Sequence, residues 1–190
     1  MLILVGLGNP GSEYATTRHN AGFLAVDHLA RRFGIRVHRL AGRALTGRGV
    51  FGGREFILAK PQTFMNLSGR AVEALLGANN AVPSDLLVLC DDVDLPLGQV
   101  RLRSSGGAGT HKGLKSILET LGTPEFPRLR IGIGPQEGDS ADFVLDPFPS
   151  ADLEALEALF PRLGEGVELL ITGGIEASMR FLNPRPPSSV

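Results

Sequence analysis

The 190-residue sequence predicts an α/β fold: a single-domain, three-layer globule in which helices flank a mixed β-sheet. The first observation is that short apolar segments typical of strands alternate with segments of helical periodicity. The second is a Gly-Gly pair between two strand-like segments, which adds an antiparallel hairpin to this order. The third is a hydrophobic content of 43%, which is enough for one full core in a chain of this length.

A strand, a helix, a hairpin and a second helix are expected in the first half of the chain. The segment 2–5 is short and apolar, as in a buried strand, and residues 20–33 repeat apolar side chains at the helical period. Gly52 and Gly53 separate two strand-like segments, which predicts a tight hairpin. The expected strands are 2–5, 43–51 and 54–59, and the expected helices are 20–33 and 66–76.

The second half continues the alternation and ends in a polar tail. Short apolar runs predict strands, and the longest helical pattern places apolar residues from Leu156 to Leu170 on one face. Residues 184–190 contain three prolines and two serines, so they are expected to be disordered and the domain is assigned to residues 1–183. The expected strands are 86–90, 99–103 and 129–133, and the expected helices are 110–121 and 153–171.

Composition excludes several classes of protein. The single cysteine, Cys90, excludes an internal disulfide and a cysteine-based zinc site, and its apolar neighbours predict a buried structural thiol. No apolar run approaches the roughly 20 residues of a membrane span, and no basic segment precedes an apolar one at the N-terminus. We therefore expect a soluble, cytoplasmic protein that does not insert into membranes.

The charges are separated along the chain, although the formal net charge is only −1. Residues 1–134 hold 16 Lys and Arg against 10 Asp and Glu, whereas residues 135–190 hold 3 against 10. Such segregation can leave a basic face for a phosphate backbone, although a solvated acidic helix would explain the acidic part equally well. Residues 99–118 contain no acidic residue but four basic ones: Arg101, Arg103, Lys112 and Lys115.

A glycine-rich loop follows the first strand. Gly6, Gly8 and Gly11 match the spacing G-x-G-x-x-G of dinucleotide-binding proteins. In those proteins the helix starts within the glycine run, whereas the polar segment 12–17 intervenes in this chain. The acidic residue expected about 20 positions later is also missing. The loop is therefore not expected to bind a dinucleotide.

Polar residues follow several of the predicted strands. Asn9 follows the first strand, residues 60–66 follow the hairpin, Asp91 ends a buried strand, and His111 follows the next one. Ligands of α/β sheets bind beside the carboxyl ends of the strands. These residues are therefore expected to converge on one site, in which a histidine such as His19 is a candidate catalyst.

Several polar and glycine-rich motifs follow one another along most of the chain. They are Gly6–Gly11 with Tyr14, Arg18–Asn20, Lys60–Gly69, Asp91–Pro96, Gly106–Gly107 with His111, Gly113–Lys115 and Arg128–Gly134. In sequence and separation these motifs resemble bacterial peptidyl-tRNA hydrolases. Several long motifs in matching order are far more specific than any single one.

The resemblance implies an enzyme that cleaves the ester between a peptide and the ribose of tRNA, recycling tRNA from prematurely released peptidyl-tRNA. It also implies a twisted mixed sheet and the use of no metal or cofactor. His19 matches the general base of the family, and a neutral imidazole can take a proton from an attacking water. Asp91 matches the carboxylate that bonds this histidine, fixes its tautomer and stabilises the imidazolium.

Two asparagines match family residues in the catalytic cleft. At Asn9 and Asn66 an amide can donate to the substrate carbonyl or accept from a peptide N–H. In the family, the position of Asn9 helps to distinguish N-blocked peptidyl-tRNA from free aminoacyl-tRNA. Considered without the family, Asn9 before Pro10 is an ordinary turn residue and Asn66 an ordinary helix N-cap. The two kinds of role are compatible.

The resemblance also implies contacts with the substrate. Tyr14 and Phe64 match positions at the tRNA end, where an aromatic face can stack on an unpaired base or ribose. Met65 would line the peptide channel. Arg103 and Arg130 correspond to basic positions that clamp the terminal phosphate of the acceptor stem. The expected partner is the acceptor stem and 3′ end of peptidyl-tRNA, bound by a monomer.

One position departs from the family pattern. Where the family has an asparagine that contacts substrate and helps to place the water, this chain has Lys112. Lysine cannot accept a hydrogen bond but can pair with a phosphate, so Lys112 is carried over only as a tRNA contact. His111 keeps its family position at the start of a helix, as a substrate contact.

Two other interpretations have less support. Asp91, Asp92 and Asp94 could suggest a Mg²⁺ site, but no further acidic cluster completes it. A paralogue that binds RNA without turnover, such as a splicing factor, could use the same cleft. The joint presence of His19, Asp91 and the two cleft asparagines favours the enzyme, because binding alone needs no base and no orienting acid.

Overall fold

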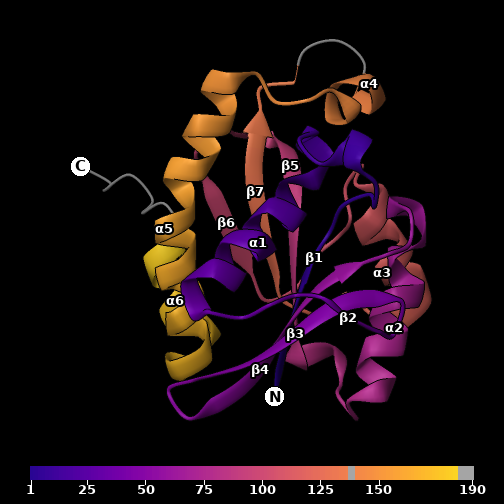
Figure 1. The fold of residues 1–190 in the computed structure, drawn as a ribbon, viewed down its shortest axis with the longest axis vertical. Coiled ribbons are helices and arrows are strands. Elements are labelled where there is room, and N and C mark those ends of the chain that lie inside the picture. The colour runs from indigo at the N-terminus through magenta and orange to yellow at the C-terminus, as the bar shows by residue number, and fades with distance from the viewer. Residues whose placement is uncertain (137–139, 184–190) are drawn as a thin grey trace.

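Seven strands form one mixed sheet through the middle of the molecule (Figure 1). The computed structural model describes residues 1–136 and 140–183. The strands lie in the order β2-β3-β4-β1-β5-β7-β6. Their bounds are β1 (Leu2–Gly6), β2 (Arg39–Ala41), β3 (Ala44–Phe51), β4 (Arg54–Pro61), β5 (Leu86–Pro96), β6 (Val100–Arg103) and β7 (Arg128–Gly134).

The centre of the sheet is parallel, and both edges are antiparallel. Strand β1 pairs in parallel with β4 and β5, and β5 pairs in parallel with β7. At the edges, β3 is antiparallel to β2 and β4, and β6 is antiparallel to β7. The central strands are largely buried on both faces, which explains their continuous apolar sequences. Their carboxyl ends meet at one end of the sheet.

Helices cover both faces of this sheet, which confirms the predicted three layers. One core cluster joins the sheet to α1, α5 and α6, and a second joins it to α2 and α3. Figure 1 shows α5 and α6 along one side of the molecule and α2 and α3 along the other. The α-helices are α1 (Ala21–Phe33), α2 (Ser68–Ala78), α3 (Lys112–Leu121), α4 (Ser140–Leu145), α5 (Ser150–Gly173) and α6 (Ile175–Leu182). The 3-10 turns are η1 (Ser12–Tyr14), η2 (Arg18–Asn20), η3 (Met65–Leu67) and η4 (Pro83–Asp85).

One strand and two α-helices of the described residues were not predicted from the sequence: β2, α4 and α6. Strand β2 has three residues, and its central Leu40 is 68% exposed, so no buried alternation marks it. Helix α6 follows α5 across Gly174, whose φ of 82° ends the longer helix. The strand predicted at 86–90 was also too short, because Asp91 and Asp92 continue the pairing of β5 with β7 although they are polar.

Two helix starts require correction. The helix predicted from residue 66 begins at Ser68, because residues 65–67 form η3; Leu67 takes the N-cap position, so Asn66 is not the cap. The helix predicted from residue 110 begins at Lys112, with His111 as its N-cap. The tail expected to be disordered, 184–190, lies outside the described residues.

The start of α1 lies directly on the sheet because glycines occupy the contact. A Cβ on Gly22 would lie 2.4 Å from the carbonyl oxygen of Leu89 and 2.5 Å from the nitrogen of Leu7. A Cβ on Gly6 would lie 2.2 Å from the carbonyl oxygen of Gly22. Gly6, the first glycine of the spacing that resembles a dinucleotide fingerprint, therefore serves packing. This packing holds η2, which carries His19, against β5.

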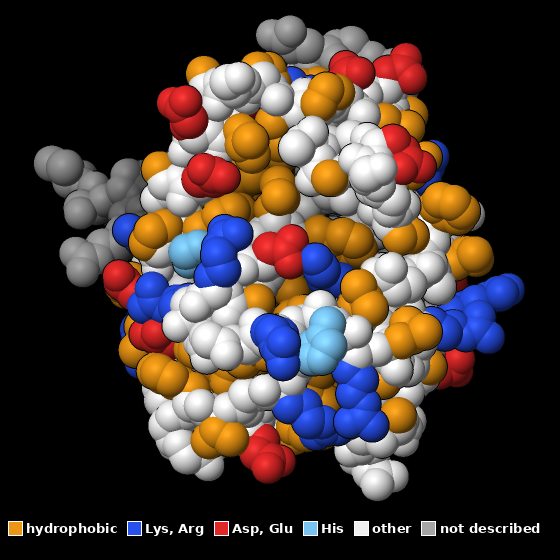
Figure 2. All heavy atoms as spheres, viewed as in Figure 1, with side chains coloured by type: hydrophobic (Ala, Val, Ile, Leu, Met, Phe, Trp, Pro, Cys, Tyr) orange, Lys and Arg blue, Asp and Glu red, His pale blue; other side chains and the backbone are white. Residues whose placement is uncertain are grey.

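The surface charges are unevenly distributed. In Figure 2, Lys and Arg side chains gather at and below the middle of the face shown, over β2 to β4, whereas Asp and Glu are most frequent in the upper part near α4 and occur singly elsewhere on the face. Residues 28–54, which contribute to this basic area, contain seven arginines and no acidic residue. Among residues 1–136 and 140–183, no helix is both long enough and apolar enough to cross a membrane.

Gly22→Ala is expected to lower the free energy of unfolding by about 2–3 kcal/mol, because the added methyl group must displace backbone atoms of Leu89 in β5 and of Leu7 directly after β1. Gly77→Ala in α2 is the matched control, since no atom beyond its own turn of helix lies within 4 Å of the added Cβ. Alanine at Gly77 should raise the free energy of unfolding by about 0.5–1 kcal/mol. Urea denaturation measures both changes, and equal stability of the two variants would contradict the packing argument.

Candidate active site

A cavity of about 390 Å³ lies at the carboxyl ends of the parallel strands. Its walls come from the loops after β1 and β4, from β5, from the start of α3 and from α4. All the predicted site residues except Arg103 line this cleft, so the predicted convergence is observed for them. They are Asn9, Tyr14, His19, Phe64, Met65, Asn66, Asp91, His111, Lys112 and Arg130.

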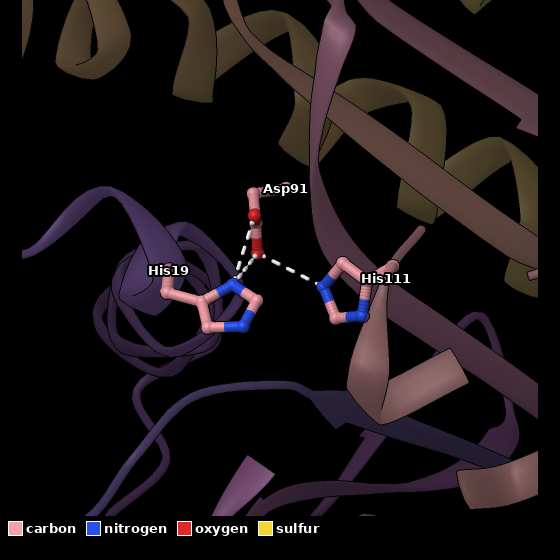
Figure 3. Close-up of side chains that lie close together, drawn as sticks. All are labelled: His19, Asp91 and His111. Atoms are coloured by element: carbon pink, nitrogen blue, oxygen red, sulfur yellow. Dashed lines mark hydrogen bonds and ion pairs between the residues drawn. The ribbon is translucent and has the colours of Figure 1, made fainter. Parts of the chain in front are cut away.

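His19 and Asp91 form a hydrogen-bonded pair whose side chains are 8% and 2% exposed. Nδ1 of His19 lies 2.9 Å from both carboxylate oxygens of Asp91. Because an ionised carboxylate only accepts, Nδ1 must carry the proton, which leaves Nε2 as the unprotonated nitrogen. Figure 3 shows this second nitrogen pointing away from the carboxylate. It makes no hydrogen bond with any described residue, so it is free to accept a proton.

Asp91 is ionised in spite of its burial. Burial alone would raise the pKa of its carboxyl, but the adjacent rings of His111 and His19 outweigh this effect. Both rings lie against the carboxylate and donate to it, and they lower the pKa of Asp91 well below its usual range. A permanent negative charge is therefore placed where it stabilises a proton taken up by His19.

His111 lies on the other side of the same carboxylate (Figure 3). Its Nε2 lies 3.0 Å from Oδ1 of Asp91. Its Nδ1 accepts the backbone N–H groups of Gly113 at 3.1 Å and Leu114 at 3.2 Å, as the N-cap of α3. Both ring nitrogens already have protein partners, so His111 can contact a substrate only through its ring carbons.

Asn9 is held by hydrogen bonds to two neighbouring segments. Its backbone N–H donates to Oδ1 of Asn20 at 2.8 Å, and its carbonyl oxygen accepts from Nδ2 of Asn20 at 3.0 Å. Its side-chain Oδ1 accepts the backbone N–H of Met65 at 2.8 Å. This last bond fixes the orientation of the carboxamide, because an N–H must face its oxygen. The NH₂ group makes no bond to a described residue and is left for the cleft.

The segment 64–66 forms one wall of the cleft. Phe64 is 58% exposed, and Asn66 is also exposed with no side-chain hydrogen bond to a described residue. Met65 is buried between them against Gly113, where a Cβ would lie 2.5 Å from its Sδ. Tyr14, half-buried in η1, also lines the cleft. Aromatic and amide groups are thus presented to a ligand, while the methionine anchors the wall.

The predicted basic contacts occupy different positions. Nη1 of Arg130 lies 3.2 Å from Oδ2 of Asp92, and its Nη2 donates to the carbonyl of Gly107 at 2.8 Å. A phosphate at Arg130 would therefore share the guanidinium with Asp92. Lys112 is exposed where α3 enters the cleft wall. Arg103 is exposed on β6 and lies outside the cleft lining.

The wall formed by α4 was missed from the sequence. Arg18, the neighbour of His19, holds this segment: its guanidinium lies 4.3 Å from the ring centroid of Phe143, and its backbone N–H donates to Asp146 at 3.1 Å. A helix of six residues is too short to show a clear apolar period. The cleft residues from α4 are Ala141, Val144 and Leu145.

Arg128 supports the loop that precedes His111, a role the sequence did not reveal. Its fully buried guanidinium donates to the carbonyls of Gly106 and Gly107, and also to those of Pro124 and Phe126. Burial first, and then the charge of Arg130, lower the pKa of Arg128. Four carbonyl acceptors keep this cation in place without a carboxylate partner among the described residues.

One group of three potential metal ligands occurs in the described part of the chain: His19, Asp91 and His111, with ligand atoms within 4.8 Å of one another. A metal on Nε2 of His111 would have to replace the proton on that nitrogen. Because Nδ1 accepts two backbone N–H groups, the ring would then become an imidazolate or leave its position as the helix cap. The donor set therefore fits a hydrogen-bonded network better than a metal site.

A family model described as peptidyl-tRNA hydrolase matches residues 3–189. The chain belongs to the peptidyl-tRNA hydrolase family. The peptidyl-tRNA hydrolase of Alkaliphilus oremlandii is 47% identical over 184 residues, which cover 96% of this chain and 100% of the relative. That of Acidobacterium capsulatum is 48% identical over 191 residues, which cover 97% of this chain and 96% of the relative.

A solved peptidyl-tRNA hydrolase has the same architecture. The crystal structure of the protein from Acinetobacter baumannii matches with a TM-score of 0.91 at 36% identity, and the match covers 99% of this chain and 97% of that chain. The family resemblance and the fold class predicted from the sequence are thereby confirmed. The cleft with His19 and Asp91 is thus set in a peptidyl-tRNA hydrolase fold.

Asp91→Asn is expected to make stability less dependent on pH in the acid range. The pKa of Asp91 is lower in the folded protein than in the unfolded chain, so its contribution is present above about pH 4 and is lost as the pH falls through the folded pKa. Asparagine has no ionisable group, so the variant does not lose this contribution as the pH falls. The stability difference between wild type and variant should be about 1 kcal/mol larger at pH 5 than at pH 3. Urea unfolding at the two pH values tests this, and a constant difference would contradict it.

Proposed function

We propose that the protein hydrolyses the ester bond between a peptide and the 3′ ribose of tRNA, with His19 as the general base. The observation that carries this proposal is the His19–Asp91 pair in the cleft. Nδ1 of His19 is occupied by a buried carboxylate, whereas Nε2 is left without a partner among the described residues. A chain of the peptidyl-tRNA hydrolase family that retains this pair has the group that water activation requires.

The reaction needs one activated water and one proton shuttle. Nε2 of His19 takes a proton from the water as its oxygen attacks the ester carbonyl, and the imidazolium is stabilised by the charge of Asp91. When the tetrahedral intermediate collapses, the carbonyl carbon releases the ribose oxygen, which receives that proton. The products are a peptide acid and a tRNA with a free 3′ terminal ribose.

Asn9 and Asn66 are proposed to stabilise the substrate and the developing negative charge. The NH₂ group of Asn9 can donate because its oxygen is already bonded to Met65. Asn66 is exposed in the same cleft and can donate from the neighbouring wall. A donor placed for an oxyanion contributes about 3–4 kcal/mol to transition-state stabilisation.

The orientation of Asn9 also supports discrimination between substrates. A peptide or N-acetyl group offers a carbonyl oxygen that the NH₂ group can bond. A free aminoacyl group has an ammonium at the same place. The NH₂ group of Asn9 cannot accept a hydrogen bond from this ammonium, so burying the ammonium there is unfavourable. The fixed carboxamide therefore favours N-blocked esters.

The tRNA is proposed to bind through its 3′ end and acceptor stem. Tyr14 and Phe64 present aromatic surface that suits stacking on unpaired bases. Lys112 at the cleft, Arg103 on β6 and Arg130 beside Asp92 supply positive charge for the phosphates. The protein is proposed to act as a monomer, in the cytoplasm where translation produces its substrate.

A non-catalytic RNA-binding protein is the second function considered. It would need the basic and aromatic groups of the cleft, but not a buried carboxylate bonded to a histidine. Burying an ion is costly, and the bond between His19 and Asp91 is explained by proton transfer and not by RNA binding. The hydrolase is therefore favoured.

His19→Ala is expected to reduce release of N-acetyl-aminoacyl groups from tRNA by about 10²–10⁴-fold, because the variant loses the nitrogen that the Asp91 carboxylate prepares to accept a proton. Binding of tRNA should survive. The assay is run in EDTA with free aminoacyl-tRNA as a second substrate, which wild type should cleave far more slowly. His38→Ala, at an exposed histidine outside the cleft, is the matched control. Near-normal turnover in His19→Ala would overturn the mechanism, and binding without cleavage by wild type would favour the RNA-binding alternative.

Asn9→Asp is expected to weaken discrimination by about ten-fold or more. One carboxylate oxygen can keep the bond to the N–H of Met65, and the other replaces the NH₂ donor with a negative acceptor. That change repels a peptide carbonyl and attracts a free ammonium. The measurement is the ratio of kcat/KM for N-acetyl-aminoacyl-tRNA to that for aminoacyl-tRNA. An unchanged ratio would remove Asn9 from the discrimination.

Arg103→Ala is expected to weaken tRNA binding and to reduce the slope of log affinity against log salt by about 1. Arg39→Ala is the matched control, because Arg39 is an exposed arginine on β2, the opposite edge strand of the sheet. Affinities of both variants are measured over a series of salt concentrations. Equal slopes for the two variants would show that β6 has no special contact with the phosphates.

A further inference from the structure

His111 differs from His19 in the use of its ring nitrogens. As the N-cap of α3, its Nδ1 accepts the N–H groups of Gly113 and Leu114. A nitrogen that accepts hydrogen bonds carries no proton, so the proton of the neutral ring is on Nε2.

The hydrogen bond between Nε2 of His111 and Asp91 requires the same tautomer. Nε2 lies 3.0 Å from Oδ1 of Asp91, and an ionised carboxylate can only accept. The helix cap therefore fixes the position of the ring proton, and this proton in turn fixes one carboxylate oxygen. The other donor to the carboxylate is Nδ1 of His19.

The cap geometry depends on a glycine. A Cβ on Gly113 would lie 3.1 Å from Cε1 of His111 and 2.5 Å from Sδ of Met65. Glycine at this position lets the imidazole lie against the first turn of α3. The rings of His111 and His19 then lie with centroids 4.9 Å apart, on either side of the carboxylate.

We propose that His111 is a positioning residue: the first turn of α3 locks it as the neutral Nε2–H tautomer, so that it orients Asp91 and leaves His19 as the proton acceptor. This inference rests on the proposed function, in which His19 is the base. The two histidines bond the same carboxylate but are not equivalent. Only His19 has a free nitrogen in the cleft, whereas His111 would have to give up its cap bonds to take a proton.

The charged groups around the carboxylate determine how this arrangement is tested. The described residues that donate to Asp91 are the two histidines. Asp92 is paired with Arg130, so these two charges partly offset each other. Among the described residues that line the cleft, the other titratable groups are Tyr14 on η1, Asp94 on β5 and Lys112 on α3.

Two variants of His111 separate its role as the N-cap of α3 from its role as a hydrogen-bond donor to Asp91. The oxygen of an asparagine can take the place of Nδ1, so His111→Asn keeps the cap but cannot reach Asp91. The amide nitrogen of a glutamine can take the place of Nε2, so His111→Gln keeps the donor but gives up the cap. The measurements are the pH profile of kcat/KM for N-acetyl-aminoacyl-tRNA and the thermal unfolding midpoint.

His111→Asn is expected to lower the plateau of kcat/KM by about five- to ten-fold and to move its acid limb upward by about half to one pH unit. The plateau falls because Asp91 loses the donor that orients it. The acid limb moves upward because Asp91, with one donor fewer, stabilises the protonated form of His19 more strongly. His111→Gln is expected to lower the unfolding midpoint while the acid limb stays at its wild-type position. An acid limb that is unmoved in the asparagine variant, or moved equally in both, overturns the proposal.

The tautomer itself is measured without reference to catalysis. In ¹⁵N spectra of the wild-type protein, Nδ1 of His111 should have the shift of an unprotonated nitrogen and Nε2 that of a protonated one. A proton on Nδ1 near neutral pH would overturn the proposal even if both variants fail to fold. A normal His111 tautomer together with an active His19→Ala variant would instead show that the proposed general base is wrong, so the two failures are distinguishable.

Discussion

The buried carboxylate of Asp91 is the group on which the geometry of the site depends. An ion with a side chain 2% exposed is stable only where donors replace the water it has lost. Those donors are His19 and His111, and each is fixed by a different element. Gly22 seats the start of α1 on the sheet, which places His19, and the first turn of α3 fixes His111. Strand β5 thus links two segments far apart in the sequence at one buried point.

The cleft separates fixed groups from groups that are left for substrate. The side chains of Asp91 and Met65 are buried, and the half-buried His111 has protein partners at both ring nitrogens. Phe64 and Asn66 are exposed in the same cleft, and the free nitrogen of His19 faces it. Hydrogen bonds to the buried groups prevent their rotation, so Nε2 of His19, the proposed proton acceptor, has a defined direction before a ligand binds.

The sequence by itself determined the fold class and most of the site. Alternating apolar runs and helical periods predicted the three layers, and polar residues after the strands predicted where the cleft lies. The family motifs then named His19, Asp91 and the two asparagines. The confirmed fold class and the observed convergence of these residues on one cleft share a physical cause, since period, glycine spacing and chemical type are local properties of the chain. The short elements β2, α4 and α6 were missed, because a few half-exposed residues carry no clear period.

Only the tertiary structure determined which polar atoms of the site bond within the protein and which are left free. Sequence spacing could not show that Oδ1 of Asn9 is taken by Met65, or that Arg130 is held by Asp92, because both contacts join residues more than 30 positions apart. It could not show that Arg103 lies outside the cleft, or that His111 uses both ring nitrogens within the protein. Hydrogen bonds have direction, and that direction is set by the packing of distant elements. The sequence therefore determines which residue types are present, whereas the fold determines where their protons lie and which of their polar atoms are free.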